Sequence, residues 1–206
     1  MGSGKTIVAL FAALLALENG YQAALMAPTE LLAEQHHRTF NAFLAPLGIE
    51  PLLLTGSLDA RARRAVLAKM ARDEPVLVVG THALLQESAR FSNLGFVAID
   101  EQHRFGVEQR KAIAAKGEAP DTLLMSATPI PRSLALTTYG DLDVTTLEER
   151  PAGRQSITTV SRAESSRERV FSFIRRQVEA GRQAYIVYPV IDESEKTDLK
   201  AATVMF

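Results

Sequence analysis

Two short stretches within the first 101 residues carry side chains that could act on a phosphate group. Gly2 to Thr6, with the sequence Gly-Ser-Gly-Lys-Thr, matches the second half of a phosphate-binding loop. In such a loop glycines let backbone N–H groups face phosphate oxygens, the lysine reaches the β- and γ-phosphates, and the hydroxyl binds Mg²⁺. Asp100 and Glu101 follow an apolar run of strand length. Together the two stretches predict a site that binds and hydrolyses a nucleoside triphosphate.

The acid pair supplies the groups that the loop lacks. One carboxylate can hold Mg²⁺, and its neighbour can orient the attacking water for in-line phosphoryl transfer. The pair lies about 95 residues after Lys5, and no acid precedes Glu18 in the helix that Lys5 opens. The alternatives are an accidental Gly-Ser start for the loop and a solvated strand end for the acids. The acid pair argues against an accidental start, and the loop argues against a solvated strand end.

Hydroxyl side chains follow four separate predicted strands, beside glycine or proline. They are Thr29, the pair Thr55 and Ser57, Thr81, and the pair Ser126 and Thr128. Taken singly, each is best explained as an ordinary helix cap. Because parallel strands end at the same edge of a sheet, together they predict a surface that holds nucleic-acid phosphates independently of sequence.

These residues must be positioned by a repeating pattern of apolar strand, polar tip and helix. Such a pattern predicts an α/β fold with a parallel sheet covered on both faces. The acid pair then lies at the carboxyl ends of the strands, where open α/β sheets bind ligands. The predicted strands span residues 22–27, 51–54, 76–79, 97–100 and 122–125, and the predicted helices span 5–18, 30–43, 60–72 and 107–116.

A second α/β unit is expected after a charged stretch that contains proline and glycine. We expect a first lobe over residues 1–147, a linker over 148–155, and the start of a second lobe over 156–206. In the second lobe the pattern predicts a helix over 164–180 between strands at 157–160 and 184–188. The sequence opens inside the phosphate loop and ends in a helical pattern, so both lobes are expected to be truncated, the first without its first strand.

The composition is typical of a globular protein and excludes several kinds of site. The 206 residues include 47% hydrophobic and 23% charged residues, with a net charge of −1, so any DNA contact must be local. Cysteine is absent, which excludes disulfides and thiolate metal sites. The four histidines show no metal-ligand spacing. No apolar run reaches membrane-spanning length. We therefore expect a cytoplasmic protein that does not enter a membrane.

Taken together, the motifs resemble those of helicase superfamily 2 translocases. The loop is similar to motif I, residues 27–31 to motif Ia, Asp100 to His103 to motif II, and Ser126 to Pro129 to motif III. Residues 100–110 and 128–135 are most similar to the branch that remodels stalled forks. A rival branch, the transcription-repair coupling translocases, shares residues 103–107, but Gln102 and residues 140–144 favour the first branch.

The resemblance implies a RecA-like P-loop NTPase lobe and the start of a second RecA-like lobe. It implies an ATP-dependent DNA helicase that translocates on double-stranded DNA and acts in repair and recombination on forks and Holliday junctions, working as a monomer when complete. ATP and Mg²⁺ are the implied cofactors, and the truncated chain alone is expected to be inactive. A non-catalytic ATP- or DNA-binding module is the alternative from another class.

The same resemblance assigns roles residue by residue. Lys5 and Thr6 would bind phosphate and Mg²⁺, with Gly2, Ser3 and Gly4 completing the loop. Asp100 would hold the metal, and Glu101 would activate water. The remaining roles are the coupling of hydrolysis to motion, assigned to His103, Ser126 and Thr128, and contacts to the DNA backbone, assigned to Thr29, Ser57 and Thr81.

Overall fold

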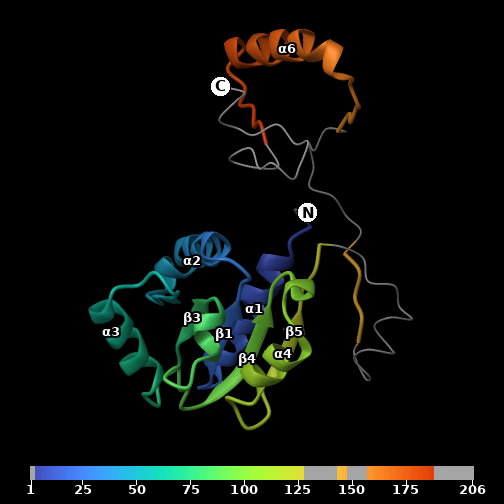
Figure 1. The fold of residues 1–206 in the computed structure, drawn as a ribbon. Coiled ribbons are helices and arrows are strands. Elements are labelled where there is room, and N and C mark those ends of the chain that lie inside the picture. Colours follow the sequence, from blue (N-terminus) through green and yellow to red (C-terminus); the bar gives the residue numbers. More distant parts are fainter. Residues whose placement is uncertain (1–2, 128–142, 148–156, 188–206) are drawn as a thin grey trace, which may run out of the picture. The chain divides into compact units, whose positions relative to one another are not determined.

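The computed structural model describes residues 3–127, 143–147 and 157–187. The chain divides into two compact units, residues 1–154 and 155–206 (Figure 1). Gly2, Thr128 and the predicted linker at 148–155 lie outside the described residues.

The first unit contains a five-stranded sheet in which every pairing is parallel, in the order β2-β3-β1-β4-β5. All five carboxyl ends therefore share one edge, as the sequence predicts. The strands are β1 (Gln22–Met26), β2 (Leu52–Leu54), β3 (Leu77–Gly80), β4 (Leu94–Ile99) and β5 (Asp121–Leu124). The helices are α1 (Lys5–Glu18), α2 (Glu30–Leu44), α3 (Ala60–Met70) and α4 (Val107–Ala114), with short 3₁₀ turns η1 (Ala45–Leu47), η2 (His82–Leu85) and η3 (Gln102–Arg104).

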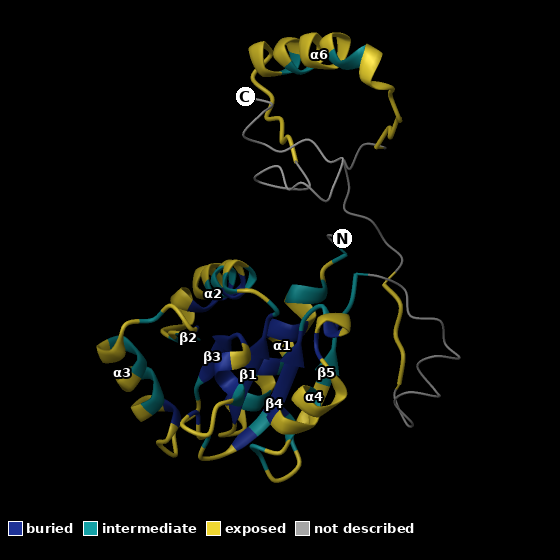
Figure 2. Cartoon of the chain, in the orientation of Figure 1, coloured by how far each residue is buried: buried dark blue, intermediate teal, exposed yellow. Residues whose placement is uncertain are grey.

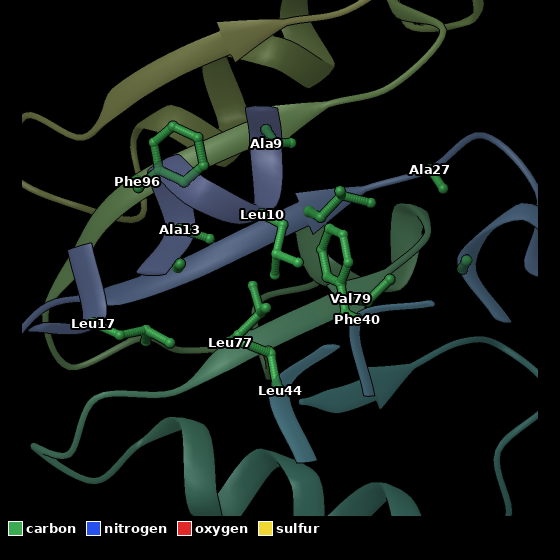
Figure 3. Close-up of a cluster of buried hydrophobic side chains, with 14 of the residues drawn as sticks. Ala9, Leu10, Ala13, Leu17, Ala27, Phe40, Leu44, Leu77, Val79 and Phe96 are labelled. Carbon is green, nitrogen blue, oxygen red and sulfur yellow. The ribbon is translucent and has the colours of Figure 1, made fainter. Parts of the chain in front are cut away.

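Both faces of the sheet are covered, which explains why its strands are apolar without alternation. In β1 every residue is buried (Figure 2). Ala23 and Leu25 belong to the cluster that α1 and α2 cover, and Ala24 and Met26 belong to the cluster on the opposite face with α3 and α4. Figure 3 shows the first cluster, in which Phe40 of α2 lies among β-strand side chains. The parallel α/β fold is therefore confirmed.

The helix starts that the sequence marks are capped by side chains. Thr29 Oγ1 accepts a hydrogen bond from the backbone N–H of Leu32 at 3.3 Å. Asp59 Oδ1 accepts from Arg61 and Ala62 at 2.8 Å each. Such caps contribute about 0.5–2 kcal/mol each, so the first turns of α2 and α3 are fixed beside the strand ends that precede them.

A single buried amide joins two loops at the opposite edge of the sheet. The Gln22 side chain is fully buried, and its Nε2 donates to the carbonyls of Met70 and Arg72 at 2.9 Å and of Glu74 at 3.2 Å. Its Oε1 accepts from the N–H groups of Ser92 and Asn93 at 2.9 and 3.2 Å. The amide thereby satisfies backbone groups that burial would otherwise leave unpaired.

The second unit differs from its prediction. Residues 157–163 and 182–187 form no strand and are exposed, so the predicted strands at 157–160 and 184–188 are wrong wherever the structure describes them. The predicted helix begins as the turn η4 (Glu164–Ser166) and continues as α6 (Arg167–Glu179). A strand needs a neighbour for its backbone hydrogen bonds, and the described part of this unit offers none, whereas a helix satisfies its bonds internally.

No helix among the residues with described positions is long and apolar enough to cross a membrane.

Candidate active site

The predicted phosphate loop leads directly into α1. Gly4 has a φ of 88°, in the left-handed region that favours glycine, and its carbonyl accepts the N–H groups of Ile7 and Val8 at 3.0 and 3.3 Å. Lys5 Nζ donates to Ser3 Oγ at 3.3 Å. The first turn of α1 holds no acid. No acid of the helix itself therefore opposes the positive end of the helix dipole, which favours an anion.

Asp100 and Glu101 lie where β4 ends. The N–H of Asp100 donates to the Met26 carbonyl at 2.9 Å, which continues the pairing of β4 with β1. Glu101 then turns into the left-handed region with φ 47° and ψ 50°, and it is the one non-glycine residue with positive φ in the described part of the chain. Such a conformation costs about 1–3 kcal/mol and is typical of functional sites.

The Asp100 carboxylate is held in its charged form. Burial works against the charge, but the hydrogen bond and positive field of His36, the Glu101 N–H and the charge of Lys5 hold the pKa of Asp100 below its usual value. His36 Nε2 lies 2.7 Å from Asp100 Oδ2, and the Glu101 N–H donates to Oδ1 at 2.9 Å. The charge of the loop lysine thus favours the ionised form of the first acid.

From the sequence alone, His36 is a candidate only as a metal ligand, and the spacing of the histidines does not support that role. The pattern of α2 does indicate a role for His36. The buried face of this helix consists of Ala33, His36, Phe40 and Leu44. These positions recur at helical spacing, and His36 is the one polar side chain on that face. A histidine on an apolar face predicts a buried partner, although the pattern does not identify Asp100.

Of the residues predicted to couple hydrolysis to motion, His103 and Ser126 are described, and both lie near the acid pair. His103 Nδ1 is 3.4 Å from Glu101 Oε2. The N–H of Gln102 donates to the Met125 carbonyl at 3.1 Å, and the N–H of Met125 donates to Ile99 at 2.8 Å. Ser126, which follows Met125, is half-buried. The end of β5 is therefore fastened to the turn that carries the acids.

The residues predicted to touch DNA fall into two groups. Thr29 and Ser57 are exposed at the ends of β1 and β2. Glu30 joins them, because its Oε1 accepts the backbone N–H of Ser57 at 3.0 Å. Thr81 is buried, with only 1% of its surface exposed, and its hydroxyl has no hydrogen-bond partner. Thr81 is thus not presented to a ligand in this structure.

A family model described as DEAD/DEAH box helicase matches residues 1–137, which is more than half of the chain. The chain belongs to this helicase family. The match covers the phosphate loop, the acid pair and the turn after β5, and it confirms the class of protein that the motifs predict.

Several proteins that are similar to this chain are named ATP-dependent DNA helicase RecG. Over 98% of its length the chain is 54% identical to the ATP-dependent DNA helicase RecG of Synechocystis sp. and 48% identical to that of Aquifex aeolicus. It spans 24% and 26% of those proteins. A solved structure of RecG bound to a three-way DNA junction matches 92% of the chain with a TM-score of 0.75 and 45% identity, over 25% of that protein. The predicted RecA-like fold is therefore confirmed, and so is the predicted similarity to RecG rather than to the rival branch.

Proposed function

We propose that this chain is the ATP-binding motor segment of a RecG-type DNA helicase. In this proposal ATP hydrolysis drives movement on double-stranded DNA and remodels stalled forks and Holliday junctions. The observation that carries the proposal is the site at the carboxyl edge of the sheet, where a strained Glu101 follows an ionised Asp100 within the field of Lys5. The similarity to RecG proteins supports the choice of substrate.

We assign the nucleotide chemistry to the first half of the site. Gly2, Ser3, Gly4 and Lys5 would hold the phosphates of ATP. Thr6 and Asp100 would hold Mg²⁺, and both offer the hard oxygen donors that Mg²⁺ prefers. The ion would supply positive charge to the phosphate oxygens. An ionised Asp100 fits this group, because a carboxylate must be deprotonated to bind a metal.

Glu101 would orient and polarise the attacking water, as the acid next to the metal ligand. Glu101 Oε2 lies 3.4 Å from His103 Nδ1, whereas Asp100 Oδ2 lies 2.7 Å from His36 Nε2, so the two carboxylates have different partners. His103 would couple ATP hydrolysis at this site to Ser126 and Thr128, which follow β5 in the sequence.

DNA would be held by its phosphates at the strand ends. Thr29 and Ser57 are exposed, and Ser57 would exchange its contact with the Glu30 carboxylate for a phosphate. Thr81 can contribute only if its loop shifts, because its hydroxyl is buried. We further propose a first lobe over 1–147, a linker over 148–155 and a second lobe from 156, in a protein that acts as a cytoplasmic monomer on branched DNA.

The test is a Lys5→Ala variant in a protein of RecG length that carries this sequence. ATP hydrolysis is measured with a three-way junction, with linear duplex and without DNA. We expect junction-stimulated hydrolysis in the unmodified protein and a loss of about 10²-fold or more in the variant, because the phosphates lose their fixed positive charge. Lys111→Ala is the matched control, since Lys111 is exposed on α4. Equal rates for Lys5→Ala and the control refute an ATP-driven function at this site.

A further inference from the structure

His36 reaches the acid pair from a different part of the chain. It lies on α2, 64 residues before Asp100, and its Nε2 is 2.7 Å from Asp100 Oδ2. The two side chains are 10% and 14% exposed. A hydrogen bond to a charged group at this depth is shorter and stronger than one on the surface, so His36 is a fixed partner of the carboxylate.

Both oxygens of Asp100 are engaged by this protein. His36 holds Oδ2, and the Glu101 N–H holds Oδ1 at 2.9 Å. Two anchors at different oxygens stop the carboxylate from rotating about its side-chain bonds. Each carboxylate oxygen has two lone pairs, so one on each oxygen remains for a metal ion or for its bound water.

The same contact determines which nitrogen of the imidazole carries a proton. An ionised carboxylate only accepts hydrogen bonds, so the Nε2 of His36 must carry a proton. The ring itself is held by α2, because its centroid lies 6.1 Å from that of the fully buried Phe40. The Nε2–H donor therefore has a defined direction.

We propose that His36 is a positioning residue that orients the Asp100 carboxylate for its metal ion through an Nε2–H donor. The proposal rests on the proposed function, because Asp100 is a metal ligand only if this is an ATP site. Partners that hold a metal ligand in place are typically worth about 10–100-fold in metal affinity or activity. We expect an effect of that size from His36.

Two substitutions separate the hydrogen bond from the packing. His36→Phe keeps an aromatic ring against Phe40 but removes the donor. His36→Gln removes the ring but returns an N–H donor at a similar distance from the backbone. His37→Phe is the matched control, because His37 is the next residue of α2 and its Nε2 contacts the Pro51 carbonyl at 2.9 Å, away from the acids.

The activity measurement is the Mg²⁺ concentration that half-saturates ATP hydrolysis, together with kcat, in a RecG-length protein that carries this sequence. For His36→Phe we expect a half-saturating concentration about 10–100-fold higher, or a kcat lower by that factor. His36→Gln should recover most of the loss, and His37→Phe should stay within about threefold of the unmodified protein. A His36→Phe variant that equals the control overturns the proposal, as does a His36→Gln variant that recovers nothing.

A second measurement does not depend on activity. In the ¹⁵N-labelled chain, nitrogen-detected NMR should show His36 with its proton on Nε2, and Asp100→Ala should release that preference. A His36 protonated only on Nδ1 overturns the proposal. If the unmodified RecG-length protein hydrolyses no ATP, the proposed function fails, and the NMR result still decides whether His36 holds Asp100.

Discussion

The Glu30 carboxylate accepts the backbone N–H of Ser57 at 3.0 Å, although the two residues are 27 positions apart. This contact joins the first turn of α2 to the loop after β2. The Glu30 carboxylate packs closely against Gly56 of this loop, since a Cβ added at Gly56 would lie 3.0 Å from Glu30 Oε1. The same helix carries His36 against Asp100. Helix α2 therefore contacts both the loops proposed to hold DNA and the acid proposed to hold the metal.

The contact with Ser57 should depend on pH. Hydrogen bonding from the Ser57 hydroxyl lowers the pKa of Glu30, partial burial opposes it, and the N–H groups of Ser57 and Gly56 and the charge of His82 lower it further, so that the pKa lies below 4.5. A group whose pKa is lowered in the folded state stabilises that state above its unfolded pKa. The contribution is therefore complete above about pH 4.5 and is lost as pH falls through the folded pKa.

The measurement is the amide proton shift of Ser57 by NMR as pH is lowered. We expect a titration with a midpoint below 4.5 that disappears in Glu30→Gln. Glu34→Gln is the control, because Glu34 pairs with Arg38 on the exposed side of α2 at 3.1 Å. A Ser57 titration that survives Glu30→Gln would show that another group controls this loop.

Glu101→Gln should separate binding from turnover. The amide keeps the size of the side chain but cannot accept a proton from water, and loss of a positioned base costs about 10²–10⁴-fold in rate. In a RecG-length protein we expect kcat for ATP to fall by that factor, with nucleotide affinity changed by less than about threefold. The measurement is steady-state hydrolysis alongside fluorescent-nucleotide titration. Rates within a few-fold of the unmodified protein would mean that another residue activates water.

Gln22→Leu should destabilise the first unit without touching the site. The substitution leaves buried carbonyl and N–H groups of two loops without partners, and each such group costs about 1–3 kcal/mol. We expect the free energy of unfolding to fall by roughly 2–4 kcal/mol in denaturant titrations. Gln35→Leu on the exposed face of α2 should change it by less than about 0.5 kcal/mol. Equal effects of the two substitutions would contradict the role of the Gln22 amide.

DNA binding should depend steeply on salt and little on base sequence. Hydroxyl groups and helix starts at the strand ends can hold phosphates, and contacts to phosphates release counterions as salt rises. We expect the logarithm of the association constant to fall linearly with the logarithm of salt concentration, with similar slopes for junctions of different sequence. Fluorescence anisotropy measures both. A marked preference for one sequence at equal salt and junction shape would argue for contacts to bases.

Local patterns in the sequence were enough for the elements of the first unit. Helix α1 begins at Lys5 and ends at Glu18, the range that the sequence predicts, and Thr29 caps α2 as expected. These features depend on residues within a few positions of each other. The phosphate loop and the acid pair were likewise recognisable, because their chemistry requires particular residue types in a short stretch.

Contacts between distant residues were decided by the tertiary structure alone. The residues near His36 in the sequence do not indicate that Asp100 is its partner. Likewise, the residues near Thr81 do not predict that its hydroxyl is buried. The strands predicted at 157–160 and 184–188 failed for the same reason, since apolar composition gives a segment strand propensity but not a neighbour to pair with. Helix capping and helix formation are satisfied within one segment of chain. Sheet pairing, burial and the orientation of Asp100 depend on which segments the fold brings together.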